Sequence, residues 1–216
     1  MGLFIKICGI TRLEDALAAL EAGADALGFV SHPPSPRHIE PEEIAGIIAE
    51  TARGIPRKTF KAVGVFVNPT KDSLETHLAA GIDVIQLHGD ETAEFALQAA
   101  ETASDVEVWK ALRPRTPEDS AQYVGFPADK FLIDAFHGKI RGGTGIKLDA
   151  ETAAAAITVL DKPVILAGGL TPENVFETAR TLHPFGLDVS GGVEASPGIK
   201  DHARLKRFIR AVRGDV

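Results

Sequence analysis

The sequence predicts a parallel α/β fold, specifically a (β/α)8 TIM barrel. Short apolar runs alternate with alanine-rich or amphipathic helical patterns, and the alternation repeats eight times along the chain. Near-continuous apolar strands are typical of parallel sheets that helices cover on both faces. Eight such units favour closure into a barrel, and we expect residues 1–216 to form a single domain with short loops.

Each expected strand is a short apolar or β-branched run. The eight strands are Phe4–Cys8, Ala26–Val30, Ala62–Val67, Val84–His88, Val106–Leu112, Lys130–Asp134, Pro163–Ala167 and Leu187–Ser190. The helices expected between and after them are Leu13–Ala22, Pro41–Ala52, Lys71–Ala80, Ala93–Thr102, Pro117–Val124, Ala150–Leu160, Pro172–Leu182 and Asp201–Arg213. Thr11 with Glu14 resembles a capping box, and the prolines at three helix starts suit a first turn.

An open doubly wound sheet is the alternative to a barrel. That fold would place a glycine-rich dinucleotide fingerprint directly after the first strand, and the segment from Cys8 to Arg12 does not supply one. Gly142–Gly145 comes closest, but Leu148 stands where the third glycine of the fingerprint belongs. The barrel therefore remains the favoured fold.

Composition and charge exclude several classes of protein. With 44% hydrophobic residues in 216, the chain can bury one sizeable core without disulfides or metals. The net charge of −7 argues against a nucleic-acid binder, and the basic segment Lys200–Arg213 is best interpreted as a terminal amphipathic helix. No apolar run is long enough to cross a membrane, and neither a secretion signal nor a cysteine pair is present. We therefore expect a cytoplasmic protein that does not bind membranes.

Polar side chains stand at the carboxyl ends of several expected strands, where TIM barrels carry their active sites. These residues are Cys8, Gln86, His88, Asp134, Asp188 and Ser190. Cys8 alone could be a small buried hydrophobe, because free cysteines are often buried. Its position is matched by Asp134 at the end of another strand, and a thiol with a carboxylate suggests proton transfer.

Two glycine-rich turns follow the seventh and eighth strands, at the place where TIM barrels often bind phosphate. The turns are Ala167–Leu170 and Ser190–Glu194, and Val193–Ser196 could begin a short extra helix beside them. Gly142–Gly145, after the sixth strand, could close the same cradle. The alternative is that these glycines only make tight turns.

Two further residues have open roles. His88 could be a general base, a metal ligand or a structural residue, and a positioning role is favoured because no second histidine lies at metal spacing on its element. Arg37 follows Ser35-Pro36 on a stiffened loop, where a planar cation suits a carboxylate. An exposed loop arginine is the alternative for Arg37.

Seven motifs in order make the chain resemble the phosphoribosylanthranilate isomerase family of tryptophan biosynthesis, over about residues 4 to 210. These motifs lie at Lys6–Thr11, Gly23–Phe29, Ser35–Arg37, Gln86–Glu91, Gly142–Gly145, Ala167–Leu170 and Asp188–Glu194. The resemblance implies a cofactor-free Amadori rearrangement of N-(5-phosphoribosyl)anthranilate to the carboxyphenylamino-deoxyribulose phosphate. It also implies the same barrel fold.

The resemblance further assigns roles to individual residues. It implies Cys8 as general base, Asp134 as general acid and Arg37 as the ligand of the anthranilate carboxylate. The phosphate-binding residues that it implies are Gly143, Gly145, Gly168, Gly169, Ser190 and Gly191. Residues expected to position the substrate are Gln86, His88 and Asp188. No metal or cofactor is expected. The expected partner is a small phosphorylated substrate, and the chain is expected to be a monomer or a homodimer.

Some questions remain open from the sequence. Lys6 shares the side-chain direction of Cys8 and is a candidate for lowering the pKa of the thiol. Ser31-His32 departs from the family pattern, in which an aromatic residue is frequent.

Two alternatives to the isomerase remain. The first is another barrel enzyme for phosphorylated ligands, such as a sugar-phosphate epimerase or a bifunctional histidine and tryptophan isomerase. The second is a phosphate-binding module without catalysis.

Overall fold

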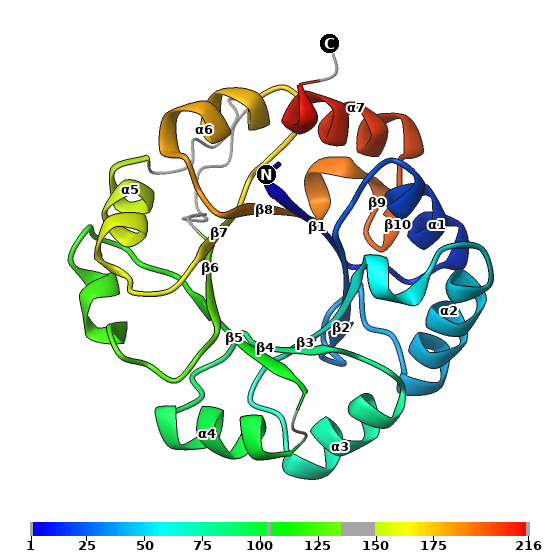
Figure 1. Cartoon of the computed structure of the whole chain (residues 1–216), viewed down its shortest axis with the longest axis horizontal. Helices are drawn as coiled ribbons and strands as arrows, with labels where there is room; N and C mark the ends of the chain where they lie inside the picture. Colours follow the sequence, from blue (N-terminus) through cyan, green and yellow to red (C-terminus); the bar gives the residue numbers. More distant parts are fainter. Residues whose placement is uncertain (1, 103–104, 135–149, 215–216) are drawn as a thin grey trace.

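The computed structural model describes residues 2–102, 105–134 and 150–214, and confirms the predicted barrel. Its eight parallel strands close in chain order, and helices surround them (Figure 1). The strands are β1 Phe4–Cys8, β2 Ala26–Ser31, β3 Lys61–Phe66, β4 Val84–Leu87, β5 Glu107–Leu112, β6 Lys130–Asp134, β7 Val164–Ala167 and β8 Gly186–Val189. The α-helices are α1 Leu13–Glu21, α2 Pro41–Gly54, α3 Lys71–Ala79, α4 Ala93–Glu101, α5 Ala150–Val159, α6 Val175–Leu182 and α7 His202–Arg213.

Helix starts follow local side-chain chemistry in most units. Thr70 and Thr92 accept the backbone N–H groups of Ser73 and Phe95, each at 3.2 Å, as N-caps of α3 and α4. The capping box predicted at Thr11 is wrong, because α1 begins after Arg12 without a side-chain cap. The Thr11 hydroxyl instead donates to the carbonyl oxygen of Gly198 at 2.5 Å, so tertiary contact overrides the local motif.

The expected helix Pro117–Val124 is also wrong. The chain there forms only the 3-10 segment η2 Asp119–Tyr123, whose i→i+3 bonds include Val124 N to Ala121 O at 3.3 Å. Gly125 follows with a φ of +78°, which ends the segment before a full α-helix can form. A second 3-10 segment, η1 Arg57–Thr59, precedes β3.

The connection from β8 to α7 carries structure that the sequence did not predict. Its first turn is the 3-10 segment η3 Gly191–Val193. Residues Val193–Ser196 do not begin a helix, because Glu194–Ser196 form strand β9, which pairs antiparallel with β10 Ile199–Lys200. This hairpin lies outside the barrel beside β1 and α1 (Figure 1).

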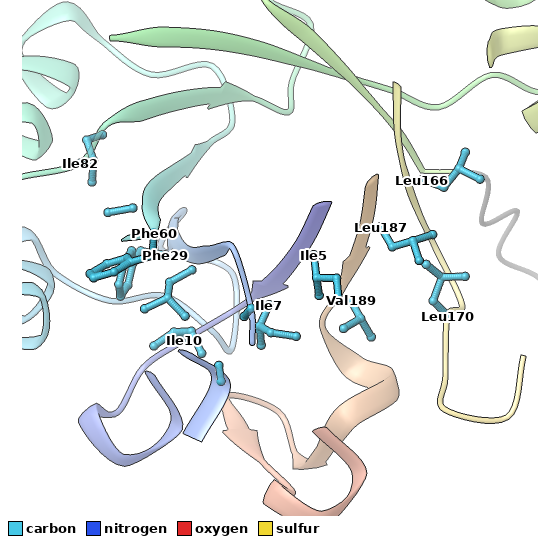
Figure 2. Close-up of a cluster of buried hydrophobic side chains, with 14 of the residues drawn as sticks. Ile5, Ile7, Ile10, Phe29, Phe60, Ile82, Leu166, Leu170, Leu187 and Val189 are labelled. Atoms are coloured by element: carbon cyan, nitrogen blue, oxygen red, sulfur yellow. The ribbon is translucent and has the colours of Figure 1, made fainter. Parts of the chain in front are cut away.

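The strands divide the core into two layers. Alternation along β1 places Ile5 and Ile7 in the layer between strands and helices, together with Leu187 and Val189 of β8 (Figure 2). Cys8 belongs to the second layer, inside the barrel. The interior is filled by side chains that include Val63, Val65, Val84, Trp109, Leu132 and Ile165. The thiol is therefore directed to the carboxyl-terminal mouth of a filled barrel.

No helix in the described part of the chain is long and apolar enough to cross a membrane.

Candidate active site

A cavity of about 620 Å³ opens at the carboxyl ends of the strands. It brings together ten of the predicted site residues: Cys8, Arg37, Gln86, His88, Asp134, Gly168, Gly169, Asp188, Ser190 and Gly191. The other two predicted residues, Gly143 and Gly145, lie outside the described residues. Apolar side chains such as Val30, Val65 and Leu170 form much of the remaining wall. A cavity of this size and mixed lining suits a small polar ligand with an apolar part.

Cys8 lies beside a buried ion pair. Lys6 and Asp188 are paired residues of β1 and β8, and Lys6 Nζ donates to Asp188 Oδ1 at 2.8 Å. Burial acts to lower the pKa of Lys6, but the charges of Asp188 and Cys8 and their hydrogen bonds together outweigh burial and hold that pKa above its ordinary value. A side chain on Gly28 would approach Cys8 Sγ to 2.8 Å and Lys6 Nζ to 2.9 Å, so glycine leaves room for the thiol and the ammonium.

The pKa of the thiol reflects two opposing effects. Burial raises the pKa of Cys8 above its ordinary value, while the charge of Lys6 lowers it and the charge of Asp188 raises it again. Lys6 thus acts in the direction expected from the sequence. The net direction, which the sequence leaves open, is upward, because removal of the thiol from water outweighs the ammonium.

Arg37 is held by a carboxylate that the sequence did not assign to the site. Its Nε donates to Glu194 Oε1 at 2.8 Å and its Nη2 donates to Glu194 Oε2 at 2.6 Å, a bidentate pair. The arginine stem crosses Gly9, where an added side chain would approach Arg37 Cδ to 2.6 Å. Gly9 has a φ of +73°, so both space and backbone conformation favour glycine there.

Lys200 lies in β10 and not on the terminal helix, which corrects the interpretation of Lys200–Arg213 as one amphipathic helix. Its side chain is fully buried, and Nζ donates to Glu194 Oε1 at 2.8 Å and to the carbonyl oxygen of Cys8 at 2.5 Å. Only the residues from His202 onward form the terminal helix. The lysine was missed because a two-residue strand such as β10 has no recognisable periodicity.

The two described glycine turns meet at the edge of the cavity. Gly168 and Gly169 have φ values of +88° and +65°, and Asn174 Nδ2 donates to the carbonyl oxygen of Gly169 at 2.9 Å. In the other turn, an added side chain on Gly192 would lie 1.8 Å from the carbonyl oxygen of Leu170. Backbone contact between the turns therefore requires glycine at position 192.

His88 is a neutral residue in this site. Burial, followed by the charge of Arg113, lowers its pKa to about 4. Its Nδ1 lies 3.1 Å from Gln86 Nε2, which fits donation from the amide to the ring. In the described ranges no group of three or more His, Cys, Asp and Glu side chains could hold a metal ion.

Asp134 ends β6 and is half-buried at the mouth of the cavity. Arg113 Nε lies 3.9 Å from Asp134 Oδ2, and Arg113 itself lines the cavity. Sequence reasoning missed Arg113, because it looked at the last residues of strands and Arg113 directly follows β5. By contrast, Lys110 near the end of β5 pairs with Glu91 at 2.6 Å and does not line this cavity.

Comparison with known proteins agrees with this fold. Residues 5–211 match the family model of N-(5'-phosphoribosyl)anthranilate (PRA) isomerase. The N-(5'-phosphoribosyl)anthranilate isomerase of Geobacter sulfurreducens is 47% identical over 211 residues, which cover 97% of this chain and 98% of the relative. The crystal structure of phosphoribosyl anthranilate isomerase from Thermotoga maritima superposes with a TM-score of 0.85 at 38% identity, covering 98% of this chain and 99% of the other.

A further solved phosphoribosyl anthranilate isomerase, in complex with reduced 1-(o-carboxyphenylamino)-1-deoxyribulose 5-phosphate, is 36% identical with a TM-score of 0.82 and covers 98% of this chain and 99% of its own. Sequence and fold thus agree over nearly the whole chain. The chain belongs to the N-(5'-phosphoribosyl)anthranilate isomerase family of tryptophan biosynthesis and is an isomerase.

Proposed function

We propose that this chain converts N-(5-phosphoribosyl)anthranilate to 1-(2-carboxyphenylamino)-1-deoxyribulose 5-phosphate, with Cys8 as general base and Asp134 as general acid. The observation that carries the proposal is the cavity that holds both groups together with a guanidinium and two glycine turns. Strands β7 and β8 separate β6 from β1, so the acid and the base approach the cavity from different sides. Such an arrangement suits proton transfer at two different atoms of one substrate.

The reaction begins with Asp134 as a carboxylic acid. It donates a proton to the furanose ring oxygen, the C1′–O bond breaks, and the nitrogen lone pair forms an iminium at C1′. The iminium acidifies the proton on C2′, and the Cys8 thiolate removes it. The electron pair of the C2′–H bond then forms an enol-amine. Ketonisation adds a proton to C1′ while the enol hydroxyl loses one, so the steps balance by proton transfer alone.

Substrate binding uses the two ends of the molecule. Arg37 binds the carboxylate of the anthranilate ring, and Gly168, Gly169, Ser190 and Gly191 hold the phosphate with Gly143 and Gly145. Neutral His88, with Gln86 and Asp188, positions the ribose portion. Because burial keeps the pKa of Cys8 high, the fraction of thiolate and with it the rate of C2′ proton removal increase with pH.

Steady-state kinetics of single variants test these roles. Cys8→Ala and Asp134→Asn should each lower kcat by about 10²- to 10⁴-fold or more, because each removes one proton-transfer group. Asp72→Asn, a carboxylate near the start of α3, is the matched control and should retain wild-type turnover. Circular dichroism and thermal unfolding verify that every variant is folded. Robust turnover by a folded Cys8→Ala or Asp134→Asn variant would contradict the assigned role.

Two further measurements test the substrate. Expression of the chain in a tryptophan auxotroph that lacks this isomerase should restore growth. A panel that contains ProFAR, the corresponding histidine-pathway substrate, should show turnover of phosphoribosylanthranilate alone. Equal turnover of ProFAR would instead favour a bifunctional isomerase.

A further inference from the structure

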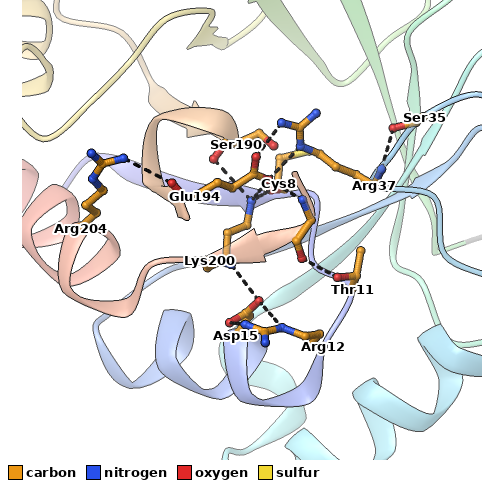
Figure 3. Close-up of polar contacts among 11 residues, drawn as sticks. Cys8, Thr11, Arg12, Asp15, Ser35, Arg37, Ser190, Glu194, Lys200 and Arg204 are labelled. Atoms are coloured by element: carbon orange, nitrogen blue, oxygen red, sulfur yellow. Dashed lines mark hydrogen bonds and ion pairs between the residues drawn. The ribbon is translucent and has the colours of Figure 1, made fainter. Parts of the chain in front are cut away.

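Glu194 makes contacts that join three parts of the site. It begins β9 and is only 7% exposed. Its two carboxylate oxygens accept hydrogen bonds from Nε and Nη2 of Arg37. Oε1 also accepts hydrogen bonds from Lys200 Nζ at 2.8 Å and from the backbone N–H of Gly198 at 3.3 Å. Figure 3 shows the carboxylate of Glu194 between these two cations.

Lys200 in turn anchors the carboxylate to the barrel. Its Nζ donates to the carbonyl oxygen of Cys8 at the end of β1 and to that of Ser190, after β8, at 3.4 Å (Figure 3). Burial acts to raise the pKa of Glu194, but the hydrogen bonds and charges of Arg37 and Lys200 together outweigh burial and lower that pKa below its ordinary value. Glu194 is therefore an anion at neutral pH and is fixed from both sides.

The contacts of Arg37 leave one edge of its guanidinium available. A guanidinium can bind a carboxylate side-on, through Nε and one terminal nitrogen, or end-on, through both terminal nitrogens. Glu194 occupies the side-on edge. Nη1 has no hydrogen-bond partner among the residues that the structure describes, and the arginine lines the cavity.

We propose that Glu194 is a positioning residue, which holds the side-on edge of Arg37 so that the end-on edge receives the ring carboxylate of the substrate. This inference rests on the role of Arg37 in the proposed function. Glu194 has two opposing effects on that ligand. Its negative charge weakens the attraction of Arg37 for a second carboxylate, whereas its bidentate grip orients the guanidinium. Positioning requires that orientation outweighs the charge effect.

A pair of ligands isolates the contribution of the carboxylate. The first is reduced 1-(o-carboxyphenylamino)-1-deoxyribulose 5-phosphate, and the second is its phenylamino counterpart without the ring carboxylate. Calorimetry gives a Kd for each, and we expect the wild-type enzyme to bind the first ligand about 10- to 100-fold more tightly, as for hydrogen bonds between charged groups. This ratio of Kd values is the readout for every variant.

Glu194→Gln keeps the size of the side chain and removes its charge. The variant should lose most of the Kd ratio, by about 10-fold, and should raise KM while kcat stays within about 3-fold. Arg204→Ala is the matched control, because Arg204 donates to the backbone carbonyl of Glu194 at 3.3 Å without touching its carboxylate. It should keep the wild-type ratio. A general loosening of the hairpin would change the ratio in both variants, and would overturn the positioning role.

Glu194→Gln leaves the Lys200 ammonium buried without its anion, which could unfold the protein. The double variant E194Q/K200M removes both charges and should show the same loss of ratio. An unchanged or higher ratio in the folded single or double variant would overturn the inference. Arg37→Ala separates the two proposals: a retained ratio there would remove Arg37 from the carboxylate site, whereas loss there with retention in the Glu194 variants refutes only the role of Glu194.

Discussion

Gly192 is the position where one methyl group should most disturb phosphate binding. An added Cβ would lie 1.8 Å from the carbonyl oxygen of Leu170, and Cβ atoms essentially never approach a heavy atom below 3.0 Å. The two glycine turns must therefore separate by about 1.2 Å, the difference between these distances, because both colliding groups belong to the backbone. A misplacement of about 1 Å in a binding site can cost about 100-fold in rate.

Gly192→Ala should accordingly raise the inhibition constant of inorganic phosphate and the KM of phosphoribosylanthranilate by about 10- to 100-fold. Gly46→Ala is the control, since an added Cβ in the middle of α2 meets nothing within 4 Å. It should leave both constants unchanged and increase stability by up to about 1 kcal/mol. A folded Gly192→Ala enzyme with wild-type phosphate inhibition would refute the contact between turns as the basis of the phosphate site.

Two further predictions concern charge inside the barrel. Lys6 lowers and Asp188 raises the pKa of Cys8. In a plot of kcat/KM against pH, the increase toward basic pH should therefore shift to higher pH in Lys6→Met and to lower pH in Asp188→Asn. A shift in the same direction in both variants would contradict this. His88 has a pKa of about 4 when folded against about 6.5 when unfolded, so the unfolded chain takes up the proton first and stability falls as pH drops from 6.5 toward 4. Between pH 7 and pH 5, the free energy of unfolding measured in urea should therefore fall by about 2 kcal/mol less for His88→Gln than for the wild type. Equal decreases would show that the imidazole is exposed to water.

The barrel was predictable because its elements depend on patterns that the sequence displays directly. Apolar alternation places Ile5 and Ile7 on one face of β1 and Cys8 on the other, and the structure follows it. The strand ends then locate the cavity, since all eight strands point the same way. The helix that failed, at Pro117–Val124, had the weakest apolar pattern and was cut short at Gly125.

The surroundings of the site were not predictable in the same way. Glu194 and Lys200 meet on an irregular hairpin, where two or three residues of strand leave no periodic signal. Arg113 was missed for a related reason, because its side chain reaches the cavity from a loop just beyond β5. Motifs in loops identify residue types that suit a chemistry, but the partners of those residues depend on tertiary contact.

Two buried ion pairs flank the strand that carries Cys8, and their placement bears on why they are present. Lys6 pairs with Asp188 beside the Cys8 thiol. Lys200 pairs with Glu194 and donates to the carbonyl oxygen of Cys8. Buried pairs of this kind often contribute little net stability, because desolvation offsets their attraction. Apolar residues of similar volume would fill the same space. The pairs are better explained by what they orient: Lys6 and Asp188 set the charge around the proposed base, and Lys200 with Glu194 fixes Arg37 relative to it.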